Sequence, residues 1–202
     1  MQLYDDLVHE REPPAGRKDK AEGGLERHLT EAAVLLAFAM HLFETEPDLL
    51  EIEIHPDGEH GKRFDIRGWL EKQGFQLTKS VGTTSYGGVY SHGERTIIVS
   101  LKPGLGDVVA LTDRQTIIAE CKGGVINSRH AGQLSRLRRG LCEAVGLLMV
   151  RDPSKERNIA VVPYTNETSR LARRMIERCH ISGIEIALIQ ADGEVNYVGK
   201  LR

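Results

Sequence analysis

The sequence has little of three things: cysteine, aromatic residues and long apolar runs. Its 202 residues include three cysteines and 5% aromatic residues. The cysteines lie far apart and form no Cys-x-x-Cys pair, which argues against a disulfide framework or a zinc site and predicts reduced thiols in the cytoplasm. No apolar stretch reaches about 18 residues, so we predict no membrane span. The N-terminal segment does not combine a basic region with an apolar one, so we also expect no signal peptide.

The residues that are present suit one domain whose charge is unevenly distributed. Hydrophobic residues make up 40% of the chain, which is enough to bury a core. We expect residues 1–22, which are polar and include a double proline, to form an arm, and residues 23–202 to form a single domain. Residues 1–60 hold 5 Lys or Arg against 15 Asp or Glu, whereas residues 122–178 hold 12 against 5. The basic region favours contact with a phosphate backbone, although a solvated helix surface would also carry such charge.

Hydrophobic periodicity predicts alternating helices and strands. Apolar residues recur every three or four positions from Leu25 to Phe43, as expected of a helix. Further helices are predicted at 65–73, 131–149 and 167–179, and strands at 51–54, 75–78, 96–99, 159–162 and 184–189. The continuous apolar run at 159–162 is typical of a buried parallel strand. The pattern as a whole predicts an α/β fold.

Three charged residues at the ends of two further predicted strands carry the strongest functional signal. Asp107 opens the first strand, and Glu120 and Lys122 close the second. Side chains two residues apart share a face of a strand, so a hairpin would gather two carboxylates and one ammonium. Two carboxylates can hold a hard divalent cation such as Mg²⁺, and the lysine can orient a water and neutralise charge on a phosphate. The alternative is an edge-strand ion pair, with Asp107 as a turn residue.

This arrangement resembles the PD-(D/E)XK nuclease superfamily, with Gly106 where the family name has proline. The resemblance implies a restriction-endonuclease-like core, in which a central mixed β-sheet is flanked by helices. From residue 95 onward the element order is similar to that of Mrr-like restriction enzymes. The resemblance also implies a metal-dependent endonuclease that hydrolyses DNA in restriction, defence or repair. Asp107, Glu120 and the backbone carbonyl of Cys121 would hold Mg²⁺, for which Mn²⁺ can substitute, and Lys122 would act on the water.

Members of this superfamily often carry an acid on the first core helix that faces the metal. The segment around Glu26 is similar to the helix start of archaeal-type Holliday junction resolvases, which makes Glu26 the first choice for a catalytic acid. Glu31, Asp65 and Glu71 are the alternatives. In the Mrr-like branch a glutamine that follows Glu-x-Lys approaches the active site, and Gln133 occupies that place here.

Four basic or polar residues in or just before the predicted helix at 131–149 are candidates for DNA contact. They are Arg129, His130, Arg136 and Arg139. Arginines bind phosphates as fixed positive charges, although each could equally be an exposed surface residue. The expected partners are therefore DNA and either a second copy of the chain or a larger protein assembly, with no membrane.

Two other functions fit the same sequence. The first is a catalytically inactive module of the nuclease fold that binds nucleic acid or a partner protein. The second is a small α/β protein of unrelated function, which would require Asp107 and Lys122 to lie far apart. The inactive module would bind DNA without a metal and without cleavage, whereas the unrelated protein would keep the acids and the lysine apart.

Overall fold

A mixed β-sheet of nine strands is the framework of the protein. The computed structural model describes residues 4, 6–56 and 63–199. From one edge to the other the strands are β12 (Val195–Tyr197), β11 (Ile184–Ile189), β10 (Glu156–Pro163), β8 (Thr116–Cys121), β7 (Val108–Leu111), β3 (Glu51–Ile54), β6 (Arg95–Val99), β5 (Gly88–His92) and β4 (Gln76–Ser80). Strand β10 runs parallel to β8 and β11, and β3 runs parallel to β6. The other neighbouring strands are antiparallel.

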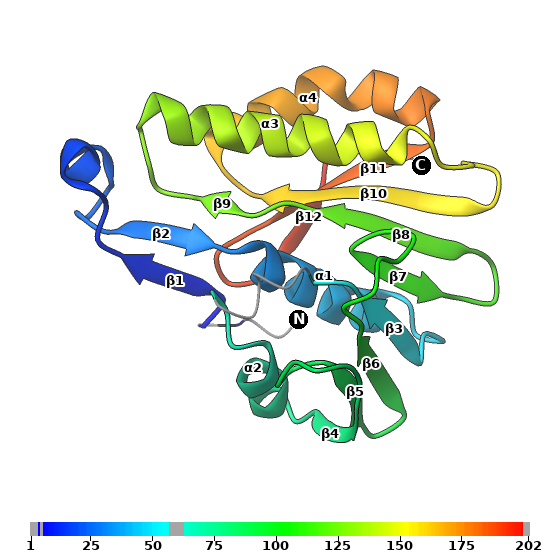
Figure 1. The fold of residues 1–202 in the computed structure, drawn as a ribbon. Helices are drawn as coiled ribbons and strands as arrows, with labels where there is room; N and C mark the ends of the chain where they lie inside the picture. Colours follow the sequence, from blue (N-terminus) through cyan, green and yellow to red (C-terminus); the bar gives the residue numbers. More distant parts are fainter. Residues whose placement is uncertain (1–3, 5, 57–62, 200–202) are drawn as a thin grey trace.

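Four α-helices flank this sheet in the described part of the chain. They are α1 (Glu31–Thr45), α2 (Ile66–Lys72), α3 (Ala131–Leu148) and α4 (Asn166–Ile181). Helices α3 and α4 lie side by side on one face of the sheet, and α1 lies on the other (Figure 1). This arrangement confirms the α/β class and the mixed sheet. Within the described residues, no helix is both long and apolar enough to cross a membrane.

Alternate residues of the central strands belong to two separate cores. Ile118 on β8 packs in one cluster with Leu141 of α3 and Ala172 of α4. Ala119, the next residue, packs in a second cluster with residues of α1. Because successive side chains of a strand point to opposite faces, this alternation explains why the apolar stretches 117–119 of β8 and 159–162 of β10 are continuous. The prediction of a buried parallel strand at 159–162 is therefore confirmed.

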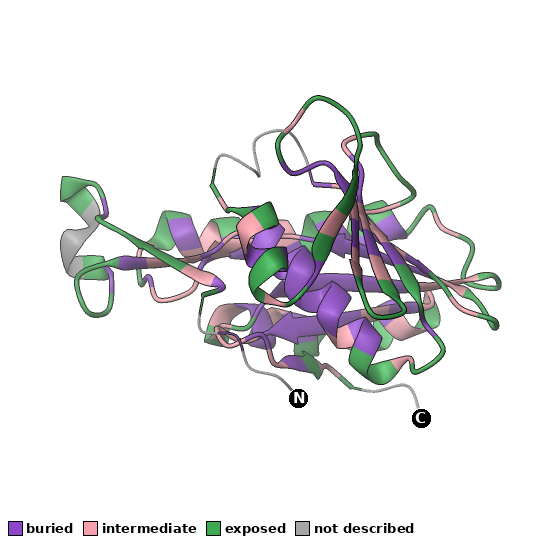
Figure 2. Ribbon diagram, turned by 90° about the horizontal axis from the view of Figure 1, so that it is seen from below, coloured by how far each residue is buried: buried purple, intermediate pink, exposed green. Residues whose placement is uncertain are grey.

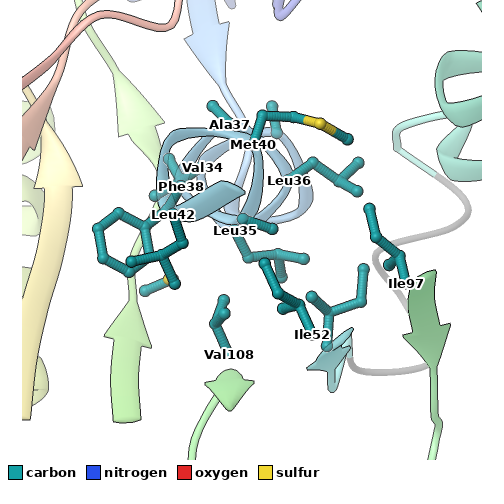
Figure 3. Packing of buried hydrophobic residues seen from close by; sticks show 14 of the residues in the cluster. Val34, Leu35, Leu36, Ala37, Phe38, Met40, Leu42, Ile52, Ile97 and Val108 are labelled. Atoms are coloured by element: carbon teal, nitrogen blue, oxygen red, sulfur yellow. The ribbon is translucent and has the colours of Figure 1, made fainter. Parts of the chain in front are cut away.

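Helix α1 is almost entirely enclosed by the rest of the protein. Eleven of its 15 residues are buried, and the helix is mostly purple in Figure 2. Figure 3 shows the helix end-on, with Ile52, Ile97 and Val108 of β3, β6 and β7 beside it. A helix that is apolar on all sides requires such an environment.

A small second sheet joins the N-terminal residues to the segment that follows β8. It consists of β1 (Val8–Arg11), β2 (Glu26–Leu29) and β9 (Gly124–Val125), all antiparallel. A 3₁₀ helix (Ala15–Lys20) connects β1 to β2, and this hairpin projects from the body (Figure 2). Within the expected arm at 1–22, Val8–Arg11 thus pairs with β2, and Tyr4 and Leu7 are buried in the core of the domain.

The prediction of one helix from Leu25 to Phe43 is wrong at its start. Residues Glu26–Leu29 form β2, because they pair with β1 on one side and β9 on the other. The helix begins at Glu31, after Thr30, whose hydroxyl accepts a hydrogen bond from the Ala33 amide at 3.2 Å. Such an N-cap satisfies an amide that has no partner within the helix. Strand pairing and capping therefore outweighed the helical period of the apolar residues.

Candidate active site

The register of the β7–β8 hairpin places Asp107 opposite Glu120. Val108 pairs with Ala119, so the same register continued by one residue sets the two acids directly across from each other. Residues that oppose each other in an antiparallel pair point to the same face. One carboxylate oxygen of Asp107, Oδ2, accepts a hydrogen bond from the Cys121 amide at 2.7 Å, which fixes its side chain beside β8.

Lys122 extends the same face of β8 and reaches two helices. Its amide donates to the Val161 carbonyl at 2.9 Å, so the ladder to β10 continues beyond Cys121. Its Nζ atom lies 3.3 Å from Oε1 of Glu31 and 3.5 Å from Oε1 of Glu143. The ammonium is therefore held between the first residue of α1 and the exposed side of α3.

The close approach of β8 to α1 depends on Gly123. A Cβ atom added at Gly123 would collide with the Glu31 amide nitrogen and lie 2.6 Å from the Thr30 carbonyl carbon. These atoms belong to the backbone, so a small shift of a side chain would not relieve the collision. Glycine at this position is what allows Lys122 and Glu31 to meet.

Gly106 has a similar role on the other strand. A Cβ atom there would lie 2.7 Å from Cγ2 of Ile118 and 2.9 Å from the Ala119 carbonyl oxygen. Real Cβ atoms keep a greater distance from such neighbours. The residue before Asp107 must therefore be small if β7 is to hold that acid against β8.

The carboxylates create an excess of negative charge at this point. Glu120 is 8% exposed, and its pKa is raised to about 7, mainly by burial and then by the charge of Asp107. Burial alone would lower the pKa of Lys122, but the attraction of Glu31 and Asp107 outweighs it, so the lysine pKa is raised. The site thus keeps its ammonium charged and favours a further cation near Glu120.

This donor set fits a hard divalent cation in part. Asp107 and Glu120 supply two carboxylates on one face, and Mg²⁺ is typically bound by one or two carboxylates while it keeps several waters. The pKa of Glu120 is raised mainly because its carboxyl is buried, and the charge of Asp107 raises it further, whereas Lys122 and Arg151 oppose the rise. Among the described residues, however, no group of three or more His, Cys, Asp or Glu side chains is arranged to hold a metal. Any cation would therefore rely on water and backbone oxygen for its remaining ligands.

The four candidate acids occupy different places in the structure, and one of them contacts Lys122. Glu31 contacts Lys122, as described above. Asp65 caps α2 by accepting a hydrogen bond from the Gly68 amide at 2.9 Å, and Glu71 of α2 pairs with Arg67 at 2.8 Å. Glu26, our first choice, lies on β2 instead of on the first core helix. Glu31 is therefore the first-helix acid that we assign to the site.

Glu26 and Gln133 contact each other in the interior. Glu26 is fully buried, and Gln133, the third residue of α3, is 3% exposed. The side-chain nitrogen of Gln133, Nε2, donates a hydrogen bond to Oε1 of Glu26 at 3.5 Å. Glu26 Oε2 lies 3.3 Å from His28 Nε2 and 3.8 Å from an Arg11 guanidinium nitrogen. The buried carboxylate thus gathers one amide, one imidazole and one guanidinium.

The four residues expected to contact DNA lie just before α3 or in its first half. His130 is its N-cap, with Nδ1 accepting a hydrogen bond from the Gly132 amide at 3.2 Å. Arg129, Arg136 and Arg139 are exposed. Arg136 lies one turn along α3 from Gln133, and so on the same side of the helix. The positions are compatible with an anionic partner at this end of the molecule.

Sequence reasoning missed several charged residues near the site. Glu143 pairs with Lys122, and the positive charge of Arg151 lowers the pKa of Glu120. Arg11, His28 and Arg63 line a cavity that also contains Glu31 and is taken up below. Each of these residues is distant from the Glu-x-Lys motif along the chain or lies on a helix surface. No local sequence pattern identifies these residues as part of the site, because they come together only in the folded chain.

The chain was compared with models of protein families, with curated proteins and with solved structures, and none of the three comparisons gave a match. The geometry of the site therefore carries the functional argument. All three cysteines are free thiols, in agreement with the expectation from their spacing.

Proposed function

We propose that this protein is a metal-dependent nuclease of the PD-(D/E)XK type that hydrolyses phosphodiester bonds in DNA. The observation that carries the proposal is the position of Asp107 opposite Glu120, with Lys122 two residues further along the same face. The unrelated α/β function would have required Asp107 and Lys122 to be far apart, whereas the charge of Asp107 acts on Lys122. Burial and the charge of Asp107 both raise the pKa of Glu120, and a cation at this point would offset their effect on the ionised carboxylate.

The roles of the residues follow from their positions. Asp107, Glu120 and the Cys121 carbonyl would hold Mg²⁺ or Mn²⁺, which would act as a Lewis acid and lower the pKa of a bound water. Lys122 would donate a hydrogen bond to the attacking water or to the phosphate and neutralise charge that develops there. Glu31 would position the lysine. Gly106 occupies the place of the superfamily's proline. A proline carries a Cβ atom, for which β8 leaves little room here, whereas glycine has none.

The basic start of α3 suggests where the DNA backbone would lie. Arg129 just before α3, and Arg136 and Arg139 in its first half, are exposed and would supply phosphate contacts that position the strand without reading its sequence. We propose a cytoplasmic role in restriction, defence or repair, either as a homodimer or as part of a larger assembly. The free thiols suit that reducing compartment.

The test is cleavage of supercoiled and linear DNA by the purified protein with Mg²⁺ or Mn²⁺, beside an EDTA control. Lys122→Ala should abolish cutting and keep the fold. Lys79→Ala, which changes an exposed lysine on the edge strand β4, is the matched control and should cut normally. Cleavage by Lys122→Ala at the wild-type rate would refute the assignment.

A binding module without catalysis is the second candidate. It is favoured by one observation: Lys122 is already held by two carboxylates, as in a structural ion pair. This candidate predicts DNA binding that is unaffected by EDTA and no cutting under any metal condition. The same assay, combined with a binding measurement, therefore decides between the two.

A further inference from the structure

A cavity of about 260 Å³ lies next to the candidate active site. Its wall is formed by the second sheet, the start of α1 and the start of α3, together with the backbone of Gly123 and Gly124. Glu31 belongs to both places, because it lines the cavity and contacts Lys122 at 3.3 Å. A group bound in the cavity would therefore lie beside the reacting bond of a substrate held at Lys122.

The lining of this cavity is strongly basic. Arg11 of β1, Arg63 before α2 and Arg136 of α3 all contribute to its wall. The acid in the wall is Glu31, whose charge is offset by Lys122. Three guanidinium groups from three separate segments suit a phosphate, whose oxygens accept paired hydrogen bonds from arginine.

The donors at the back of the cavity are fixed in place by Glu26. This buried carboxylate contacts Arg11, His28 and Gln133, each of which lines the cavity. Burial lowers the pKa of His28, and the positive charge of Arg11 lowers it further, so its imidazole is neutral at pH 7. Glu26 thus has a positioning role here, since it orients the donors Arg11 and Gln133 without entering the cavity itself.

The size and charge of the cavity define the ligand. Pockets that enclose drug-sized ligands measure roughly 300–1,000 Å³, so this cavity suits one small anionic group. A phosphate monoester carries about −1.5 to −2 charges at pH 7, whereas a phosphodiester inside a strand carries a single charge. Three arginines therefore favour the monoester.

We propose that this cavity binds the terminal phosphate of a DNA strand, and that the protein acts preferentially on phosphorylated strand ends. The proposal rests on the nuclease function given above and specifies its substrate. The terminal phosphate would occupy the cavity, and the adjacent phosphodiester would lie at Asp107, Glu120 and Lys122. The structure does not favour a 5′ or a 3′ phosphate, so the experiment includes both.

The test is fluorescence anisotropy in EDTA with three DNA duplexes that differ only at their ends. One carries 5′-phosphates, one 3′-phosphates and one hydroxyl groups throughout. We expect one phosphorylated duplex to bind at least about tenfold more tightly than the hydroxyl duplex, because one charge-assisted hydrogen bond is typically sufficient for a factor of that size. Inorganic phosphate should compete with that duplex and remove the difference.

Two variants and one control assign the effect to the cavity. Arg11→Gln and Arg136→Gln each remove one guanidinium, and both residues are exposed, so the fold should be kept. Each should reduce the preference for the phosphorylated duplex. Arg114→Gln is the control, because Arg114 is exposed in the turn at the other end of the β7–β8 hairpin, and it should retain the full preference.

The outcomes separate this proposal from the nuclease function. Metal-dependent cleavage with equal binding of all three duplexes would overturn the end preference and leave the nuclease intact. A preference that is lost in Arg11→Gln and Arg136→Gln, without any cleavage, would support the phosphate site and reject catalysis. A preference that survives in both variants would also overturn the proposal, because the phosphate would then bind elsewhere.

Discussion

Replacing Glu120 with glutamine should make the metal-free protein more stable at pH 8 and abolish DNA cleavage. The Glu120 carboxyl is 8% exposed and lies opposite Asp107. Its pKa of about 7 in the folded protein compares with an ordinary value of 4.5. Ionised Glu120 therefore destabilises the fold, and glutamine has the same shape without the charge.

The sign and the size of the effect follow from proton linkage. Between pH 4.5 and about pH 7 the folded protein binds more protons at Glu120 than the unfolded chain does. The free energy of unfolding therefore falls as the pH rises through this window, and the loss is complete above it. At 1.36 kcal/mol per pKa unit the loss amounts to about 3 kcal/mol at most. Glu120→Gln should recover about 1–3 kcal/mol of this at pH 8 and almost none near pH 4.5.

The assay is thermal and urea unfolding of both proteins in EDTA at pH 5 and at pH 8. For a chain of this length 1 kcal/mol corresponds to about 2–4 °C in the melting temperature, so the difference at pH 8 is measurable. Glu51→Gln removes an exposed carboxylate from strand β3 of the same sheet and is the control without such a pH effect. A Glu120→Gln protein that is no more stable than wild type at pH 8 would refute the reasoning, as would a gain that is larger at pH 5.

Three further predictions concern the same site. Mg²⁺ should raise the melting temperature of the wild-type protein at pH 8 through binding to the folded state, and this increase should vanish in Asp107→Asn; an equal increase in both proteins would place the ion elsewhere. Gly123→Ala should destabilise the protein by about 1–3 kcal/mol and reduce cleavage, because its Cβ collides with the start of α1, whereas full activity and unchanged unfolding would show that the backbone adapts. Glu31→Gln should lower the cleavage rate by about 10–100-fold, as expected for loss of a supporting partner, while circular dichroism stays unchanged; a normal rate would remove Glu31 from the mechanism.

Local sequence patterns were sufficient to predict the helices and strands around the motif. A period of two residues placed Glu120 and Lys122 on one face, and the hairpin register then set Asp107 opposite Glu120. The apolar stripe of α3 and the continuous apolar strand β10 were likewise recognisable, because their packing partners impose a regular period. The α/β class followed from these elements.

Such patterns could not predict contacts between segments that are distant in the sequence. The chain at Glu26 has a helical period, yet it forms β2 because β1 and β9 offer strand partners on both sides. This pairing moves the start of α1 to Glu31 and brings it against Gly123, which decides which acid meets Lys122. Sequence periodicity describes neighbours within one element, whereas pairing and close backbone approach depend on the whole chain.

The sequence by itself thus determined the identity and the common face of the three motif residues, since strand geometry fixes the spacing of side chains. Only the tertiary structure decided what surrounds them. In the tertiary structure Glu31, and not Glu26, contacts the lysine. Arg11, Arg63 and Arg136 line one cavity there. Those three arginines are far apart in the chain, and the free energy that brings them together comes from the packing of the elements that carry them and not from any local signal.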